Sequence, residues 1–185
     1  MKELFEAIRA GDSSRVAELV AADPSLAIFA AAIQGDTAQL EQLLAANRSL
    51  VSAMSSDGWT PLHLAAFFGK IDAARLLLNK GAQVNARSAN AMQNIPLHAA
   101  AAGKHMDVIK LLIDHGASVN ARQHGGWTAL HAAAQNGDLE TARALVGAGA
   151  DVQTRADNNQ TALDLALTKA QQAMVDYLEA NGARL

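Results

Sequence analysis

Apolar residues follow a helical spacing through most of the chain. One stripe covers residues 71–78, and similar stripes cover residues 106–113 and 139–146. Side chains three and four residues apart lie on one face of a helix, so each stripe predicts a helix with one buried side. Alanine-rich segments such as residues 65–66 and 132–134 alternate with these stripes. We expect the small side chains there to let neighbouring helices approach closely.

A longer unit repeats along the chain and contains both kinds of segment. Residues 58–66 read Gly-Trp-Thr-Pro-Leu-His-Leu-Ala-Ala, and residues 93–101, 126–134 and 159–166 repeat this motif with substitutions. The shared leucines are 35, 33 and 33 residues apart, and each is followed 19 residues later by the glycine of a Gly-Ala pair. These leucines and glycines are Leu62 and Gly81, Leu97 and Gly116, Leu130 and Gly149, and Leu163 and Gly182. A fixed period of this length indicates stacked structural repeats.

Two shorter copies precede these four. Leu4 is followed by Gly11, and Ile28 by Gly35, at the seven-residue offset that the first complete copy also shows. The chain is therefore predicted to contain six helix pairs. The separation of Leu4 from Ile28 is only 24 residues, which is shorter than the repeat. We expect the first pair to act as an N-terminal cap.

The motif of residues 58–66 and the Gly-Ala-x-Val-Asn segment of residues 81–85 resemble the ankyrin repeat. The resemblance covers essentially the whole chain. It implies an all-α fold with short β-hairpin fingers, an ankyrin-repeat α-solenoid of about six stacked helix pairs forming one domain, residues 1–185. The expected parts are an N-terminal capping helix pair (1–26), a divergent second repeat (27–54), full repeats (55–87, 88–122 and 123–155) and a C-terminal capping repeat (156–185).

One full repeat departs from the pattern. Lys104 stands where the neighbouring full repeats have Gly69 and Gly137, and Gly103 comes one place early. The finger of this repeat, residues 88–94, is two residues longer than the others and has no glycine between its arms. We call it the long finger. Loops of unusual length often carry function, so we expect an irregular and more mobile segment there.

Composition and charge narrow the choice of partner. The formal net charge of −3 gives no basic surface for a phosphate backbone, so we expect no nucleic-acid partner. The chain has no cysteine, which excludes disulfides and thiolate chemistry. Its longest apolar run, residues 26–33, is much shorter than the roughly 20 residues of a bilayer span. The N-terminus lacks the apolar stretch of a secretory signal. We predict a cytoplasmic protein without membrane contact.

The histidines are the residues most easily mistaken for a chemical site. His63, His98 and His131 recur in successive repeats, and stacking separates them by roughly 10 Å. That distance is too long for shared ligation through metal–nitrogen bonds of about 2 Å. The ankyrin resemblance implies instead that each histidine hydrogen-bonds to the backbone of a neighbouring turn. The sequence also contains no recognised catalytic or nucleotide-binding motif. We predict no enzyme activity, catalytic residue, cofactor or metal.

The resemblance implies that a partner binds on the concave face, formed by the finger tips and the exposed side of the first helices. Both tryptophans of the chain stand at the same finger position, and two of its four phenylalanines are adjacent. Exposed aromatic side chains near a groove centre are typical of binding hot spots. The alternative is that the tryptophan rings pack against neighbouring fingers. The predicted partner-binding residues are Ser56, Asp57, Trp59, Phe67, Phe68, Met92, Asn94, His124, Trp127, Gln135, Asn136, Asn158 and Gln160.

Three hypotheses of function follow. The first is a non-catalytic module that binds another protein or peptide through this face, as a monomer rather than a homodimer. Arg87, Arg122 and Arg155 recur with the repeat and would favour acidic partners, although arginine is common there in the family. The second is a self-associating structural protein or an antidote-type partner. The third is a small-molecule or enzymatic role at the long finger, which would require a buried polar cluster there.

Overall fold

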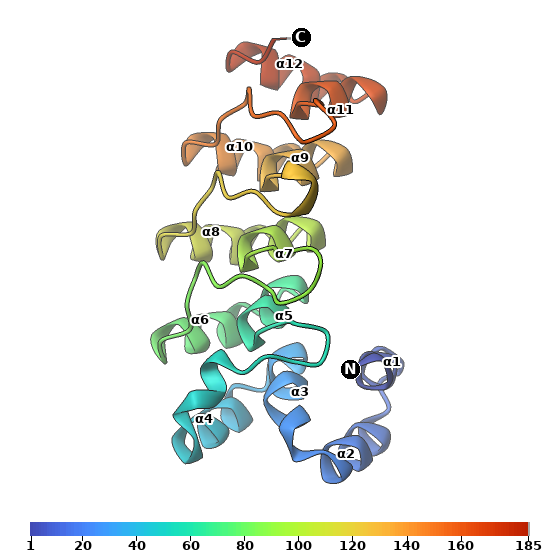
Figure 1. The fold of residues 1–185 in the computed structure, drawn as a ribbon, viewed down its shortest axis with the longest axis vertical. Coiled ribbons are helices and arrows are strands. Elements are labelled where there is room, and N and C mark those ends of the chain that lie inside the picture. Colours follow the sequence, from blue (N-terminus) through green and yellow to red (C-terminus); the bar gives the residue numbers. More distant parts are fainter. Residues whose placement is uncertain (185) are drawn as a thin grey trace.

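The computed structural model describes residues 1–184 and consists of twelve α-helices in six pairs (Figure 1). From α3 onward the pairs stack in one row, with the first helices in one column and the second helices in another (Figure 1). The predicted α-solenoid of six helix pairs is confirmed. Leu185, the last residue of the predicted C-terminal capping repeat, lies outside the described residues.

Each pair contributes a first and a second helix. The first helices are α1 (Lys2–Ala10), α3 (Ala27–Gln34), α5 (Pro61–Phe67), α7 (Pro96–Gly103), α9 (Ala129–Asn136) and α11 (Ala162–Thr168). The second helices are α2 (Ser13–Ala22), α4 (Thr37–Ala46), α6 (Ile71–Asn79), α8 (Met106–Asp114), α10 (Leu139–Gly147) and α12 (Gln172–Ala180). Short 3₁₀ turns are η1 (Pro24–Leu26), η2 (Arg48–Ser52) and η3 (His124–Gly126).

The core forms between the two columns of helices. Ala65 and Ala100, on first helices, are fully buried, and so are Leu77 and Leu112 on second helices. The alanines allow the first helices to lie close together, while each buried leucine contributes about 2 kcal/mol through removal of its surface from water. The sequence predicts helices with alanine-rich buried faces and helices with large apolar buried faces. Both kinds are present, and they share one continuous core.

The early glycine of the irregular repeat has a packing function. A Cβ atom on Gly103, the last residue of α7, would lie 2.5 Å from the carbonyl oxygen of Phe67 at the end of α5. Only glycine fits this close approach of the two helices. Lys104 then adopts the left-handed backbone conformation, with φ of 59°, that glycine adopts at the end of α9.

The fingers are not β-hairpins, which corrects the expectation from the sequence. No strand occurs in residues 1–184. The long finger is closed by a bond from the Ser88 N–H to the Asn94 carbonyl (2.8 Å), and its Ala89 N–H donates sideways to Gly58 of the preceding finger (2.8 Å). Because the backbone groups are shared with neighbouring fingers, the two arms of one finger do not form a continuous ladder.

The histidines connect successive repeats, as the family resemblance implied. His63 Nε2 lies 3.1 Å from the carbonyl oxygen of Asn94, and His98 Nε2 lies 3.0 Å from that of Ala121. Nδ1 of His98 accepts from the backbone N–H of Ile95 (3.3 Å), so Nε2 carries the proton and donates. Burial lowers the pKa of both His63 and His98 to about 4. Each ring is therefore a neutral cross-link between two repeats.

The first helix pair does not continue the regular stack. In Figure 1, α1 lies beside the column of first helices, at the side of α3 and α5. The ring of Phe5 on α1 stacks on that of Phe68, just after α5, with centroids 5.9 Å apart. Only the short turn η1 joins α2 to α3, so this pair lacks the finger that sets the register elsewhere. The pair stands at the N-terminal end, but α1 also forms a wall beside α5.

The stability of the protein is expected to fall when the pH is lowered from 7.5 to 5. An unfolded histidine has a pKa of about 6.5 and takes up a proton over this interval. Folded His63 and His98, with pKa values of about 4, remain mostly neutral. Since the unfolded state binds more protons, the free energy of unfolding should decrease by about 2 kcal/mol for each of these histidines. Urea unfolding followed by circular dichroism at both pH values measures this decrease.

Two variants identify the source of that decrease. Between the two pH values, the free energy of unfolding of His98→Gln should decrease by about 2 kcal/mol less than that of the wild type, because one buried titrating group is gone. His124→Gln changes an exposed histidine and should behave like the wild type. An equal decrease in all three proteins would contradict the assignment to the buried histidines.

Candidate partner-binding groove

Three adjoining hollows line the side of the solenoid that the fingers and first helices form. The α1 pocket, of about 470 Å³, is lined by Phe5, Arg9, Trp59, Leu64, Phe67 and Phe68. The central pocket, of about 230 Å³, is lined by Trp59, Phe67, Met92, Asn94, His98, Ala99, Ala102, Gln123 and Ala132. The outer pocket, of about 480 Å³, is lined by Met92, Ala102, Gln123, His124, Gly125, Trp127, Ala132, Gln135 and Asn136. Neighbouring pockets share residues, so together they form one hollowed surface, which we call the inner groove.

The two tryptophans serve both the fold and the groove. The Trp59 ring meets His63 edge-on, with centroids 5.5 Å apart, and Trp127 lies 5.7 Å from His131. Each ring therefore packs on the histidine of its own repeat, and both are half-buried. Each also lines the groove, Trp59 in the α1 and central pockets and Trp127 in the outer pocket.

The two adjacent phenylalanines have different environments. Phe67 is 42% exposed and lines both the α1 pocket and the central pocket. Phe68 is half-buried between the rings of Phe5 and Phe67, whose centroids are 5.9 and 5.2 Å away. Phe67 is therefore the side chain that offers free apolar surface, while Phe68 attaches α1 to the solenoid.

Asn94 places an unpaired polar group in the wall of the central pocket. Its backbone is fully bonded, because the N–H donates to Ser88 Oγ (3.1 Å) and the carbonyl accepts from the Ser88 N–H and from His63. The residue is 5% exposed, yet its side-chain oxygen has no hydrogen-bond partner among residues 1–184. Burying an unpaired acceptor costs about 1–3 kcal/mol. Rotation about the soft χ2 torsion would turn this amide toward a ligand in the pocket.

Met92 and the outer pocket complete the predicted surface on this side. Met92 is 43% exposed and lies in both the central and the outer pocket. Its carbonyl accepts from the His124 N–H (2.8 Å), which fixes the long finger to the next finger. His124, Gln135 and Asn136 line the outer pocket beside Trp127. The structure thus brings nine of the thirteen predicted residues to the inner groove, at Trp59, Phe67, Phe68, Met92, Asn94, His124, Trp127, Gln135 and Asn136.

Four predicted residues do not line the inner groove. Ser56 belongs to a separate hollow that also includes Met54. The backbone carbonyl of Asp57 accepts from the Asn90 side chain (3.0 Å). Asn158 and Gln160 hydrogen-bond to each other across the last finger (2.6 Å).

The long finger is organised by hydrogen bonds within it and to both neighbouring fingers. The Asn90 side-chain oxygen accepts from Ser88 Oγ (2.9 Å) and from the Met92 N–H (3.0 Å). Ser88 and Asn94 are buried, but the Ser88 hydroxyl is used inside the turn. Ser55 accepts from Trp59 in the same way in the preceding finger. The buried polar side chains of this finger are Ser88 and Asn94, and only the side-chain oxygen of Asn94 is left without a hydrogen-bond partner.

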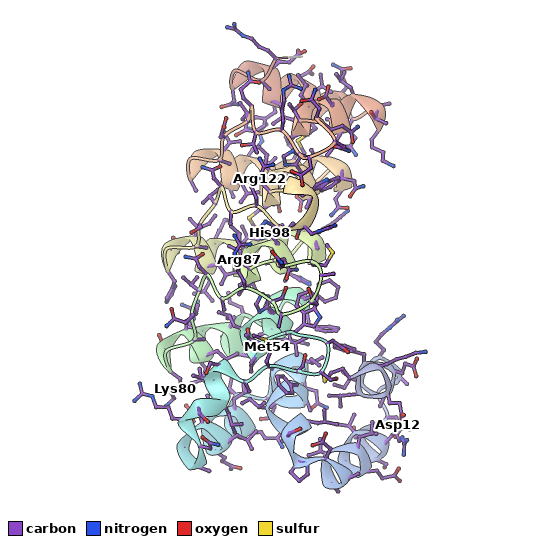
Figure 2. The ribbon with its side chains drawn as sticks, viewed as in Figure 1. Asp12, Met54, Lys80, Arg87, His98 and Arg122 are labelled. Atoms are coloured by element: carbon purple, nitrogen blue, oxygen red, sulfur yellow. The ribbon has the colours of Figure 1, made fainter. Side chains whose placement is uncertain are left out.

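The recurring arginines act as cross-links between fingers. Arg87 Nη1 donates to the carbonyls of Gln93 (2.8 Å) and Arg122 (3.0 Å), and Arg122 Nη1 donates to that of Arg155 (2.9 Å). Figure 2 shows Arg87 and Arg122 in successive repeats, with His98 between them. These bonds to neutral carbonyls fix the guanidinium groups but leave their charge in place. Of the three arginines, Arg122 alone also forms an ion pair within residues 1–184, with Asp157 (3.0 Å).

Phe5, Arg9 and Leu64 were missed by the sequence analysis although they line the groove. Leu64 belongs to the repeated motif of residues 58–66. Phe5 and Arg9 lie in the N-terminal pair, where no family motif gives a register. The short spacing between Leu4 and Ile28 was the available signal that this pair is placed differently.

The described residues offer neither a metal-binding cluster nor a membrane span. Within residues 1–184, no group of three or more histidine and acidic side chains could hold a metal ion. None of the helices in that range has the length and hydrophobicity required to cross a bilayer.

Stacked helix pairs, cross-linking histidines and a groove beside the fingers define a helical repeat protein. A family model described as ankyrin repeats (3 copies) matches residues 4–88 and 97–185, and a second, described as ankyrin repeats (many copies), matches residues 65–113. The chain therefore belongs to the ankyrin-repeat family. No curated protein sequence gives a significant match to it.

The contact between Phe5 and Phe68 is expected to hold α1 in place. Phe5→Ala and Phe68→Ala should each lower the free energy of unfolding, because each removes a half-buried ring. The decrease in the free energy of unfolding of the double variant should be about 1 kcal/mol smaller than the sum of the two single decreases, since stacked aromatic pairs interact by about that amount. Urea unfolding of the four proteins gives the coupling. Strictly additive losses would show that α1 is not attached through this pair.

Proposed function

We propose that the inner groove binds a peptide segment of another protein. Ankyrin repeats generally mediate protein–protein interaction, and the inner groove is the surface that we propose for it. Apolar side chains of the segment would occupy the central and outer pockets, against Phe67, Met92 and Trp127. The amide of Asn94 would hydrogen-bond to the main chain of the segment between them.

The unpaired amide of Asn94 is the observation that carries this proposal. Its side-chain oxygen has no hydrogen-bond partner among residues 1–184, and the residue lies in a pocket lined mostly by apolar side chains. A side-chain amide can donate and accept at once, which matches the N–H and C=O of a peptide unit. A ligand that pairs with it removes an existing penalty and gains a hydrogen bond.

The rigidity of the scaffold supports the same role. His63 and His98 connect successive repeats, and Arg87 ties the long finger to the next one. Groove residues are thereby held in place before a partner arrives. Binding then loses little side-chain and backbone entropy, which is the main cost of association for a flexible surface.

The central pocket offers no free group for acid–base catalysis. His98 is the one titrating side chain in the central pocket, and both of its ring nitrogens are hydrogen-bonded to the backbone. The ankyrin family is typically a non-catalytic interaction module. We therefore propose recognition without chemistry.

Selection from a random peptide library displayed on phage is expected to enrich sequences with apolar side chains on the wild-type protein. The selected peptides should bind Phe67→Ser and Asn94→Ala at least about tenfold more weakly, because each substitution removes part of the groove. Asn94→Ala should keep the free energy of unfolding within about 1 kcal/mol of the wild type, since the side-chain oxygen has no hydrogen bond to lose. Fluorescence polarisation with labelled peptides and urea unfolding measure the two effects.

Met54→Ser is the matched control. Met54 is 46% exposed, as accessible as Phe67, but lies in the separate hollow near η2 (Figure 2). This variant should bind the peptides as the wild type does. Peptides that lose affinity for Met54→Ser and keep it for Asn94→Ala would contradict the proposed site.

We expect the protein to be a monomer when no partner is present. Sedimentation equilibrium over a wide concentration range should therefore give the mass of one chain. A dimer that Phe67→Ser abolishes would replace the proposed function by self-association through the groove.

A further inference from the structure

The α1 pocket differs from the rest of the inner groove in its construction. Its far wall is α1, which the regular stack does not supply, and its near wall is α5 with Trp59 of the first complete finger. The Phe5 and Phe68 rings close it between the two walls, at a centroid distance of 5.9 Å. It is the end compartment of the inner groove, bounded by two segments that lie far apart in the sequence.

The volume of the pocket suits a small molecule. Pockets that bind small ligands have volumes of about 300–1,000 Å³ and are lined mainly by apolar side chains with a few polar groups. The α1 pocket measures about 470 Å³, and four of its six lining residues are Phe5, Leu64, Phe67 and Phe68. Its walls therefore favour a ligand with an apolar body.

Two of the residues that line the pocket, Arg9 and Trp59, carry a polar side-chain group, and both groups are hydrogen-bond donors. The guanidinium of Arg9 and the indole N–H of Trp59 can donate but cannot accept. No acidic side chain lines the pocket. A ligand that uses these groups must present an acceptor, and an anionic acceptor gains most from the guanidinium charge.

Arg9 has no internal counter-ion in residues 1–184. The other charged groups of α1 are paired elsewhere, Lys2 with Glu6 (3.9 Å) and Glu3 with Arg15 (2.8 Å). Arg9 forms none of the ion pairs found in the described part of the chain. Phe5 and Arg9 are one helical turn apart, on the same face of α1. The free charge is thus placed beside the apolar pocket.

We propose that the α1 pocket binds a small carboxylic acid with an apolar body. The aliphatic or aromatic part lies against Phe5, Leu64 and Phe67, and the carboxylate pairs with the Arg9 guanidinium. Neutral apolar compounds leave the guanidinium unpaired, and strongly hydrated anions such as sugar phosphates do not match the apolar walls. This site is additional to the peptide-binding role and does not depend on it.

The test uses 6-phenylhexanoate and its uncharged analogue 6-phenylhexanamide as probes. Isothermal titration calorimetry measures both affinities on the full chain. In a Trp127→Phe background Trp59 is the one tryptophan left, so its fluorescence reports binding at this pocket. We expect saturable binding of the acid with a change in Trp59 emission, and affinity for the amide lower by about tenfold because it lacks the charge-assisted bond.

Arg9→Gln tests the contribution of the guanidinium charge to binding separately from that of the apolar walls. This variant should bind the acid about tenfold more weakly and the amide as the wild type does, since only the ion pair is lost. Arg75→Gln, which removes an exposed arginine on α6 outside the pocket, should leave both affinities unchanged. Far-UV circular dichroism checks that both variants keep the helical content of the wild type.

Several results would overturn the proposal. These are the absence of saturable acid binding, equal affinity of wild type for acid and amide, or undiminished acid binding by Arg9→Gln. Binding only of a peptide with a free C-terminal carboxylate, and not of the small acid, would assign the pocket to a chain terminus instead. Peptides selected for the central and outer pockets should bind Arg9→Gln normally, so failure at one site does not decide the other.

Discussion

The short separation between neighbouring helix pairs is the constraint on which the rest of the structure depends. It requires first helices with almost no side-chain volume, and the buried alanines such as Ala65 and Ala100 meet that requirement. It also requires the polar groups between the pairs to be satisfied. The imidazoles of His63 and His98 do this by bridging to the next repeat. Because the interior is close-packed, a larger residue at these alanines would separate the repeats and break the bridges.

The inner groove is a direct consequence of that packing. The fingers form one wall, and the backbone carbonyls of Gly58 and Met92 join each of them to the next finger by a hydrogen bond. The alanine-rich first helices form the floor. Alanines such as Ala99 and Ala102 leave room where larger side chains would fill the hollow. The groove is thus an open, preformed surface, and its few large side chains, Phe67 and Met92 among them, stand out from a floor of small ones.

Helix α1 closes one end of the inner groove. A regular first repeat would have stacked beneath α3, and the surface beside α5 would then have been open. With only η1 between α2 and α3, the first pair is positioned by packing, through the buried side chains of Leu4, Ala7 and Val16 and through Phe5 on Phe68. The same placement brings the charge of Arg9 to an apolar surface that has no other charged side chain. Loss of the repeat register at the N-terminus therefore creates a pocket that the repeats do not have.

The sequence, through its resemblance to the ankyrin repeat, implied the bridging role of the histidines. By itself it determined the repeat, the six helix pairs and the alternation of alanine-rich with leucine-rich helices. These features follow from local periodicity and from residues that recur at a fixed spacing. The tertiary structure decided the rest. Whether Phe67 or Phe68 is free depends on α1, which packs against α5 from more than fifty residues away. Likewise, the bonding of the Arg87 guanidinium to carbonyls and the unpaired amide of Asn94 depend on how neighbouring fingers meet. Contacts between distant segments leave no periodic trace in the sequence, so only the folded chain reveals them.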